Sequence, residues 1–202
     1  MDNQHTQACQ YLSAIDADWA NLIATVGACT FTPDEAREPY EALVRAVAGQ
    51  QLHIKAAAAI TLKFVNYFGA FPAPEQLLAA PFDDLRACGF SGRKIETIQG
   101  IASATLSGVV PSLAEAQAMT DEALIKQLIT LKGIGRWTVE MFLMFTLGRM
   151  DVLPADDFGV VQGYKRLKKL ETAPKAKEMT LIAEAFSPHR TIAIWYLWGM
   201  PK

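Results

Sequence analysis

Apolar residues recur at the three-to-four-residue spacing of an α-helix along nearly the whole chain, and the two-residue alternation of a half-buried strand is almost absent. Prolines stand at or near the start of most of these periodic segments, where a helix tolerates a missing amide hydrogen. The pattern predicts an all-α fold built from many short helices. We expect them at 9–26, 38–50, 53–68, 74–79, 81–87, 92–106, 112–117, 121–130, 136–147, 157–170, 175–184 and 188–198.

A chain of 202 residues can bury a substantial core as one or two compact units. It contains no run of about 18 apolar residues, so we expect no membrane partner. The first twenty residues lack the basic segment and apolar core of a secretory signal, which favours a cytoplasmic protein, associated with the nucleoid if the source is bacterial. Cys9, Cys29 and Cys88 are too few and too widely spaced for a disulfide framework or a metal quartet.

The formal net charge of −2 by itself disfavours a nucleic-acid partner, but the charge is unevenly distributed. Residues 1–40 hold six acidic side chains and one basic side chain, whereas the rest of the chain holds 15 acidic and 18 basic ones. Small basic clusters occur at 93–94 and within 165–169. Such clusters are more often solvated helix faces than binding sites, so charge does not decide the partner.

The stretch LKGIGRWTVE, residues 131–140, interrupts the helical pattern with two glycines that surround Ile134. A glycine inside a helix costs roughly 1 kcal/mol relative to alanine, so this pair predicts a turn between helices 121–130 and 136–147. In such a hairpin Ile134 can fill the gap between the helices while the amides of the turn and of the next helix point outward. Outward amides at a helix start can bind a phosphate, although the glycines could equally serve the turn alone.

A second feature, DVLPADDFGV, begins at residue 151 and places Asp156 and Asp157 directly before a resumed helical pattern. Aspartate at a helix start is an ordinary N-cap. Two adjacent aspartates allow one to cap the helix while the other projects its carboxylate for chemistry.

LKGIGRWTVEMF at 131–142 followed by DVLPADDF at 151–158 resembles the helix-hairpin-helix superfamily of DNA base-excision glycosylases. The similarity is closest to the 3-methyladenine DNA glycosylase II, or alkylpurine glycosylase, branch. It extends to PYEALVRAVAGQQLHIKAAAAI at 39–60, LRACGFSGRKIETIQGIA at 85–102 and HRTIAIWYLWGM at 189–200. Several separate motifs in the same order make the resemblance more specific than the hairpin alone.

The resemblance implies that the hairpin holds the phosphate backbone of duplex DNA. The residues that match the family's backbone contacts are Gly133, Gly135 and Thr138, with Arg136 as a further candidate and Arg93 and Lys94 as weaker ones. The family's hairpin often binds a monovalent cation, Na⁺ or K⁺, through main-chain carbonyls, which would be those of Ile129, Leu131 and Ile134. Such a cation would add positive charge beside the phosphate.

The family turns the target nucleotide out of the duplex, which requires a wedge in the vacated space and a lining for the extruded base. The match places the wedge at Gln51 with Leu52 beside it, and Gln50 is an alternative. Hydrogen bonding of the glutamines to a helix end is the competing interpretation.

Trp137 and Trp198 match aromatic positions of the branch, and Phe158 and Met141 replace tyrosines of a close relative. These four residues are the expected base pocket. An indole face suits a cationic alkylated purine through stacking and cation–π attraction.

Asp157 matches the carboxylate that the family uses for chemistry, which leaves Asp156 as the expected capping neighbour. Cleavage of an N-glycosidic bond builds positive charge on the sugar, and a fixed carboxylate stabilises that charge and can orient water. Bifunctional relatives carry a lysine where this chain has Trp137, so we expect hydrolysis without strand cleavage. The four-cysteine iron–sulfur motif of some relatives is absent.

The resemblance further implies a two-lobed helical array without an amino-terminal β domain. We expect one lobe at about 51–150, with the helix-hairpin-helix at 121–147, and a second lobe formed by about 1–50 plus 151–202, with the active site between them.

The expected function is that of a monomeric, monofunctional glycosylase that excises alkylated purines, 3-methyladenine above all, and that needs no cofactor for its chemistry. Two alternatives stay open: a non-catalytic DNA-binding protein that keeps the hairpin, and a glycosylase for another lesion such as hypoxanthine, ethenoadenine or 1-methyladenine.

Overall fold

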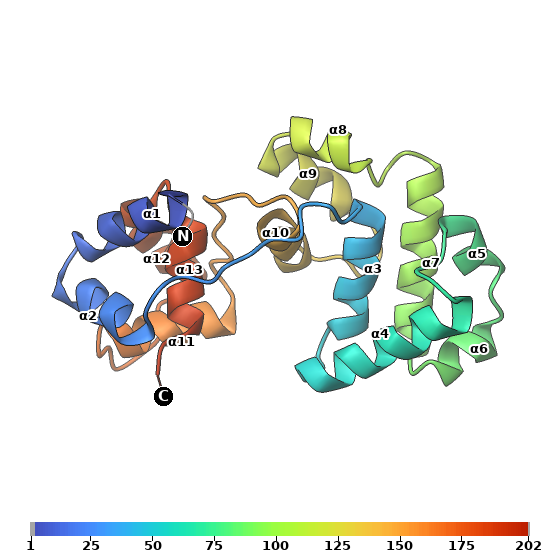
Figure 1. The fold of residues 1–202 in the computed structure, drawn as a ribbon, viewed down its shortest axis with the longest axis horizontal. Coiled ribbons are helices and arrows are strands. Elements are labelled where there is room, and N and C mark those ends of the chain that lie inside the picture. Colours follow the sequence, from blue (N-terminus) through green and yellow to red (C-terminus); the bar gives the residue numbers. More distant parts are fainter. Residues whose placement is uncertain (1–2, 202) are drawn as a thin grey trace. The chain divides into compact units, whose positions relative to one another are not determined.

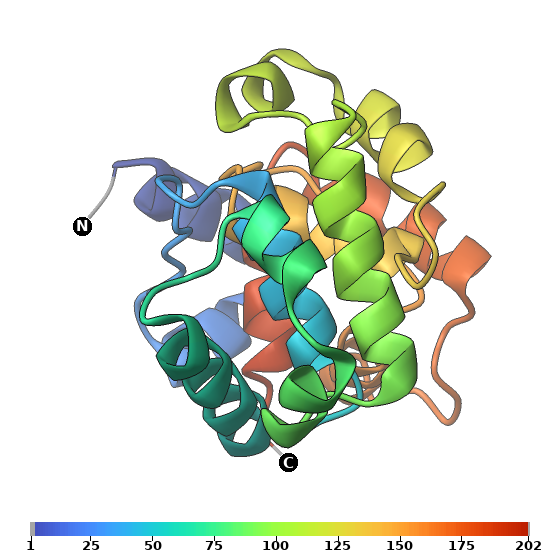
Figure 2. The ribbon, with the colours of Figure 1, turned by 90° about the vertical axis from the view of Figure 1, so that its right-hand side faces the viewer.

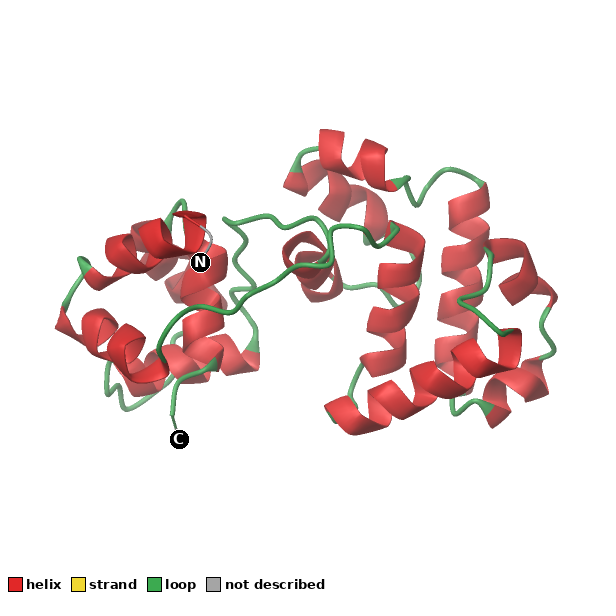
Figure 3. Ribbon diagram, viewed as in Figure 1, coloured by secondary structure: helices red, strands yellow, loops and turns green. Residues whose placement is uncertain are grey.

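The computed structural model describes residues 3–201, and within them every regular element is a helix (Figure 3). The all-α prediction is confirmed. In chain order the elements are α1 (Asn3–Ser13), α2 (Ala17–Val26), α3 (Pro39–Gly49), α4 (Ile54–Phe68), α5 (Pro74–Ala79), α6 (Phe82–Ala87), α7 (Gly92–Leu106), α8 (Leu113–Ala118), α9 (Asp121–Leu128), α10 (Arg136–Phe145), α11 (Phe158–Leu167), α12 (Ala176–Ile182), the 3₁₀ turn η1 (Ala183–Phe186) and α13 (Arg190–Trp198). None of the helices in this described range is both long enough and apolar enough to cross a bilayer.

Most predicted boundaries agree with the structure to within a few residues, but the single helix expected at 9–26 is wrong. Asp16 divides it into α1 and α2. The backbone at Asp16 is extended, and its carboxylate accepts hydrogen bonds from the amides of Asp18 at 3.0 Å and Trp19 at 3.1 Å. An aspartate that caps a new helix start offers the backbone an alternative to continuing the helix, and apolar periodicity does not register this.

The chain forms two compact units whose division differs from the one expected. One unit combines the chain up to Pro33 with the chain from Gly148 onward, and the other runs from Asp34 to Leu147. Helix α3, which we placed in the lobe with the chain termini, therefore belongs with α4–α10. It does so because α3 packs on α4, α7 and α10 of that unit.

Helix α7 is central to the unit from Asp34 to Leu147, with α3 and α5 against it (Figure 2). Its residues Ile95, Ile98 and Ile101 are fully buried, at the spacing of one helix face. Full burial of an isoleucine side chain contributes about 1.5–3 kcal/mol, so this face is a main source of the unit's stability. Helices α9 and α10 pack against each other in the same unit (Figure 1).

In the other unit, α13 packs against α11, α1 and α2. Its residue Tyr196 is fully buried and its hydroxyl donates to the carbonyl of Gly27 at 2.9 Å. Trp19 of α2 is also fully buried and makes an edge contact with Phe186, with 4.9 Å between ring centroids. This apolar core sets the position of α11, whose first turn follows the Asp156–Asp157 pair.

Candidate active site and hairpin

The hairpin between α9 and α10 has the predicted form. Helix α9 begins after Thr120, whose hydroxyl caps the amide of Ala123, and α10 begins at Arg136. Gly133 has a φ of 84°, which favours glycine, and a Cβ there would collide with the hydroxyl of Thr97. Ile134 is buried, with only 4% of its surface exposed, so it fills the gap between the helices as expected.

Three exposed amides of the hairpin are available to an external acceptor. Among residues 3–201 no acceptor occurs for the main-chain N–H of Gly133, Gly135 or Arg136, and all three residues are exposed. Exposed donors at the start of a helix, where the helix dipole is positive, form an anion site. The amides of Gly133 and Gly135, for which phosphate contacts were predicted, are therefore open to an acceptor.

Thr138 does not fit the predicted contact with the DNA backbone. Its side chain is buried, and its amide donates to the carbonyl of Gly135 at 3.0 Å. Its hydroxyl also accepts a long hydrogen bond, 3.4 Å, from the side-chain amide of Gln50. Thr138 therefore stabilises the first turn of α10 from inside.

The guanidinium of Arg136 is already occupied by two acids. It donates to Glu122 at 2.6 Å and to Glu140 at 2.9 Å, and the Glu140 side chain is buried. These ion pairs offset the positive charge of the guanidinium, which would otherwise attract a phosphate. The main-chain amide of Arg136 therefore remains available, while its guanidinium is engaged by these two carboxylates.

Two of the three carbonyls proposed for a monovalent cation have no hydrogen-bond donor. Within the described residues, no donor occurs for the carbonyl oxygens of Ile129 and Ile134, whereas that of Leu131 accepts from the amide of Ile134 at 3.1 Å. Unsatisfied carbonyl oxygens are the ligands that a hard monovalent cation requires. The donor set fits the expected cation.

The turn that follows α3 is anchored at two points. The Lys94 ammonium donates to the carbonyls of Ala48 and Gln50, each at 2.9 Å. The Gln50 side-chain amide donates to the carbonyl of Gly133 at 3.2 Å, which joins this turn to the hairpin. Lys94 is therefore not the solvent-facing phosphate contact that we considered, and its burial lowers its pKa below the ordinary lysine value.

These contacts separate the three wedge candidates. Gln50 is held against the hairpin, which matches the competing interpretation of a glutamine bonded near a helix end. Gln51 is exposed and has a φ of 58°, and Leu52 has 41% of its surface exposed. Gln51 and Leu52 are thus the two wedge candidates whose side chains are exposed to solvent.

Asp157 is the N-cap of α11, in place of the expected Asp156. Its Oδ1 accepts from the amide of Val160 at 2.8 Å and from the indole Nε1 of Trp198 at 2.9 Å. Asp156 is exposed. One residue therefore combines the capping role and the fixed carboxylate, and two donors hold its Oδ1 in place.

Trp198 lies against the start of α11 because residue 159 is a glycine. A Cβ on Gly159 would lie 2.7 Å from Cδ1 and 3.0 Å from Nε1 of Trp198, and 3.1 Å from Oδ1 of Asp157. Phe158, which lies between Asp157 and Gly159 in the sequence, has 77% of its surface exposed. The structure brings together three of the residues predicted for the site, Asp157, Phe158 and Trp198, around this glycine.

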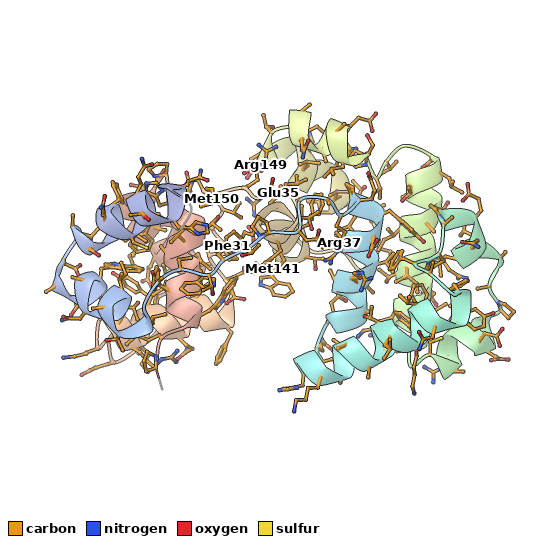
Figure 4. The ribbon with its side chains drawn as sticks, viewed as in Figure 1. Phe31, Glu35, Arg37, Met141, Arg149 and Met150 are labelled. Carbon is orange, nitrogen blue, oxygen red and sulfur yellow. The ribbon has the colours of Figure 1, made fainter. Side chains whose placement is uncertain are left out.

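The other two predicted pocket residues lie on α10, in the unit from Asp34 to Leu147. Trp137 is in its first turn, directly after the hairpin, with 42% of its surface exposed. Met141, labelled in Figure 4, is half-buried one turn further along. An exposed indole beside exposed main-chain amides can stack on a base.

Two features of this arrangement were missed at the level of sequence. One is the close approach at Gly159, and the other is the anchoring role of Lys94. Gly159 had a signal, since a glycine in the first turn of a helix suggests a close neighbour. The contacts of Lys94 had none, because Gln50 lies 44 residues away along the chain.

The sequence matches the family described as "HhH-GPD superfamily base excision DNA repair protein" over residues 44–188. DNA-3-methyladenine glycosylase 1 of Schizosaccharomyces pombe is 46% identical over 202 residues, which cover 98% of this chain and 88% of that protein. Alkylbase DNA glycosidase-like protein mag2 of the same organism is 38% identical over 204 residues, covering 100% of this chain and 96% of that protein. The solved structure of the S. pombe 3-methyladenine DNA glycosylase (Mag1) in complex with abasic-DNA has a TM-score of 0.88, with 46% identity and 95% of each chain covered.

Proposed function

Because this chain belongs to the HhH-GPD superfamily of base excision DNA repair proteins, we propose that it is a DNA glycosylase that removes alkylated purines, chiefly 3-methyladenine, from duplex DNA. The observation that carries the proposal is the carboxylate of Asp157, fixed at a helix start by Val160 and Trp198. The exposed amides of Gly133, Gly135 and Arg136 supply the grip on the DNA backbone.

The reaction breaks the bond between C1′ of the sugar and the nitrogen of the alkylated purine. Alkylation makes the purine a good leaving group, and the departing base takes the bonding electrons with it. Positive charge that develops at C1′ is stabilised by the carboxylate of Asp157. Water then adds its oxygen to C1′ and loses a proton to Asp157 or to solvent, which leaves an abasic site.

We assign this enzyme hydrolysis alone. A lyase reaction needs an amine that forms a Schiff base with C1′, and the position that could supply it carries Trp137. The indole of Trp137 is exposed and that of Trp198 is half-buried, and we propose that each offers a face that attracts a cationic purine.

Binding of DNA through neutral amides also fits the acidic composition of the chain. Main-chain donors hold a phosphate without a lysine or arginine side chain, so a net charge of −2 does not prevent association. We propose that Na⁺ or K⁺ at the carbonyls of Ile129, Leu131 and Ile134 supplies additional positive charge at the hairpin. The protein is proposed to act as a monomer.

The test is replacement of Asp157 by asparagine. Asparagine keeps a side-chain oxygen for the amide of Val160 but removes the negative charge, so the helix start is retained. We expect release of 3-methyladenine from methylated duplex DNA to fall by about 10²–10³-fold, the typical loss for one electrostatic group in an active site. Affinity for an abasic-site duplex should change much less.

Asp156→Asn is the matched control, since it makes the same chemical change one residue away on an exposed side chain, and it should release base at the parent's rate. Unchanged release by Asp157→Asn would remove this residue from the mechanism. If the parent protein releases no base, the non-catalytic DNA-binding alternative gains support; if borohydride traps a covalent adduct, the hydrolysis-only assignment is wrong. Lesion duplexes in competition will define the substrate range.

A further inference from the structure

The turn Gln50–Gln51–Leu52 has a conformation that its own sequence does not favour. Gln51 adopts a φ of 58°, in the left-handed region, where a non-glycine residue costs about 1 kcal/mol or more. Within the turn, the amide of Leu52 donates to the carbonyl of Gly49 at 3.1 Å, and the amide of Gln50 donates to Ala46 at 3.1 Å. Such a conformation persists only where surrounding groups hold it.

The main external support is Lys94 of α7. Its ammonium donates to two carbonyls at the end of α3, those of Ala48 and Gln50, and therefore touches the residues on either side of Gly49. The C-terminal end of a helix carries partial negative charge, so a cation there is favourable as well as hydrogen-bonded. Lys94 is partly buried, which limits the alternative positions open to its side chain.

The second support comes from the hairpin through Gln50, whose side-chain amide donates to the carbonyl of Gly133. The turn is thus held by α7 on one side and by the phosphate-binding hairpin on the other. All of these residues belong to the unit from Asp34 to Leu147, so the support is internal to that unit.

We propose that Lys94 is a positioning residue for duplex opening: it holds the turn so that Gln51 or Leu52 is presented to the base stack. The inference rests on the proposed function and concerns the step that precedes bond cleavage. Turning a nucleotide out of the stack costs a few kcal/mol, least for a base that has no partner. When the backbone of the wedge is already ordered, opening the duplex requires no further loss of conformational entropy from that backbone.

The experiment measures single-turnover excision by Lys94→Met, which removes the ammonium and keeps the length of the side chain. Two duplexes carry one 7-methylguanine each, paired with cytosine in the first and facing an abasic-site analogue in the second. We expect the variant to lose about tenfold on the paired lesion and less than about twofold on the unpaired one, since opening is easier without a partner base. Gln51→Ala should give the same paired-against-unpaired difference.

Lys63→Met is the matched control, because Lys63 is exposed on α4 of the same unit and lies outside the turn and the hairpin. It should match the parent on both duplexes. Lys94→Arg retains the charge and the donors, and should recover part of the rate on the paired lesion. Should Lys94→Met fail to fold, Lys94→Arg serves as the test variant, with a smaller loss confined to the paired lesion.

An equal loss by Lys94→Met on both duplexes, or no loss on either, overturns the proposal. A protein that releases 7-methylguanine from neither duplex leaves the proposed function to the 3-methyladenine assay and still permits the test, through the fluorescence of a 2-aminopurine placed beside a 7-methylguanine that is paired with cytosine. In that measurement the parent should raise the fluorescence by unstacking the probe, and Lys94→Met should raise it less at saturating protein. Equal fluorescence with both proteins would refute the role of Lys94.

Discussion

At the scale of single residues, the carboxylate of Asp157 depends on its two neighbours Trp198 and Gly159. The indole Nε1 donates to Oδ1 at 2.9 Å, and only the missing side chain of Gly159 lets the ring approach so closely. A methyl group at residue 159 would require the ring or the carboxylate to shift, because contacts below 3.0 Å between carbon atoms are strongly repulsive.

We therefore expect Gly159→Ala to reduce single-turnover excision by about tenfold, comparable to the loss of one hydrogen bond to a charged group. Trp198→Phe removes the same donor without adding a methyl group at residue 159. It separates the hydrogen bond from the steric displacement, and the two variants should show similar losses in excision. Full activity of Gly159→Ala would mean that the Trp198 contact has no part in catalysis.

At the scale of helices, α11 and α13 cross at a second close contact, at Gly163. A Cβ on Gly163 would overlap the main-chain carbonyl of Leu197, which cannot move away by rotating a side chain. We expect Gly163→Ala to lower the free energy of unfolding by about 2–3 kcal/mol through overpacking. In a chain of this size, the Tm should fall by roughly 5–10 °C.

Gly100 of α7 offers the matched comparison, because nothing lies within 4 Å of a Cβ built on it. Gly100→Ala should raise the free energy of unfolding by about 1 kcal/mol from helix propensity alone, and thermal unfolding followed by circular dichroism will show both changes. Destabilisation by Gly100→Ala, or stability in Gly163→Ala equal to that of the parent, would contradict the packing described for these two helices.

At the scale of the whole molecule, the charges near the hairpin are largely paired with each other. Arg136 is paired with Glu122 and Glu140, and Lys132 is paired with Glu96 at 2.7 Å. Few cations remain there to displace counterions from DNA, and the amide contacts are neutral. DNA binding should thus depend weakly on salt.

The logarithm of the association constant for an abasic-site duplex, plotted against the logarithm of salt concentration, should have a slope of magnitude below about 4. Proteins that contact 6–10 phosphates through lysine and arginine give roughly twice that slope. Fluorescence anisotropy between 50 and 200 mM salt provides the measurement. A slope steeper than about 6 would show that basic side chains, and not the hairpin amides, dominate the contact.

The sequence by itself determined the helical class, most helix boundaries, the hairpin with its buried Ile134 and the helix start after the aspartate pair. These features follow from interactions within a few residues, such as apolar periodicity, caps and the conformational freedom of Gly133. Local signals were weaker where two of them competed, as at Asp16, where a cap interrupted a continuous apolar pattern.

Tertiary structure decided which polar groups remain available for function. Asp157 meets Trp198 from 41 residues away, and Lys94 meets Gln50 from 44 residues away. Contacts of this kind hold the carboxylate of Asp157 against Trp198, engage the side chains of Arg136 and Thr138 internally, and anchor the turn after α3 to Lys94. A side chain's partners across such separations depend on how the helices pack, and that information is not present in any local stretch of sequence.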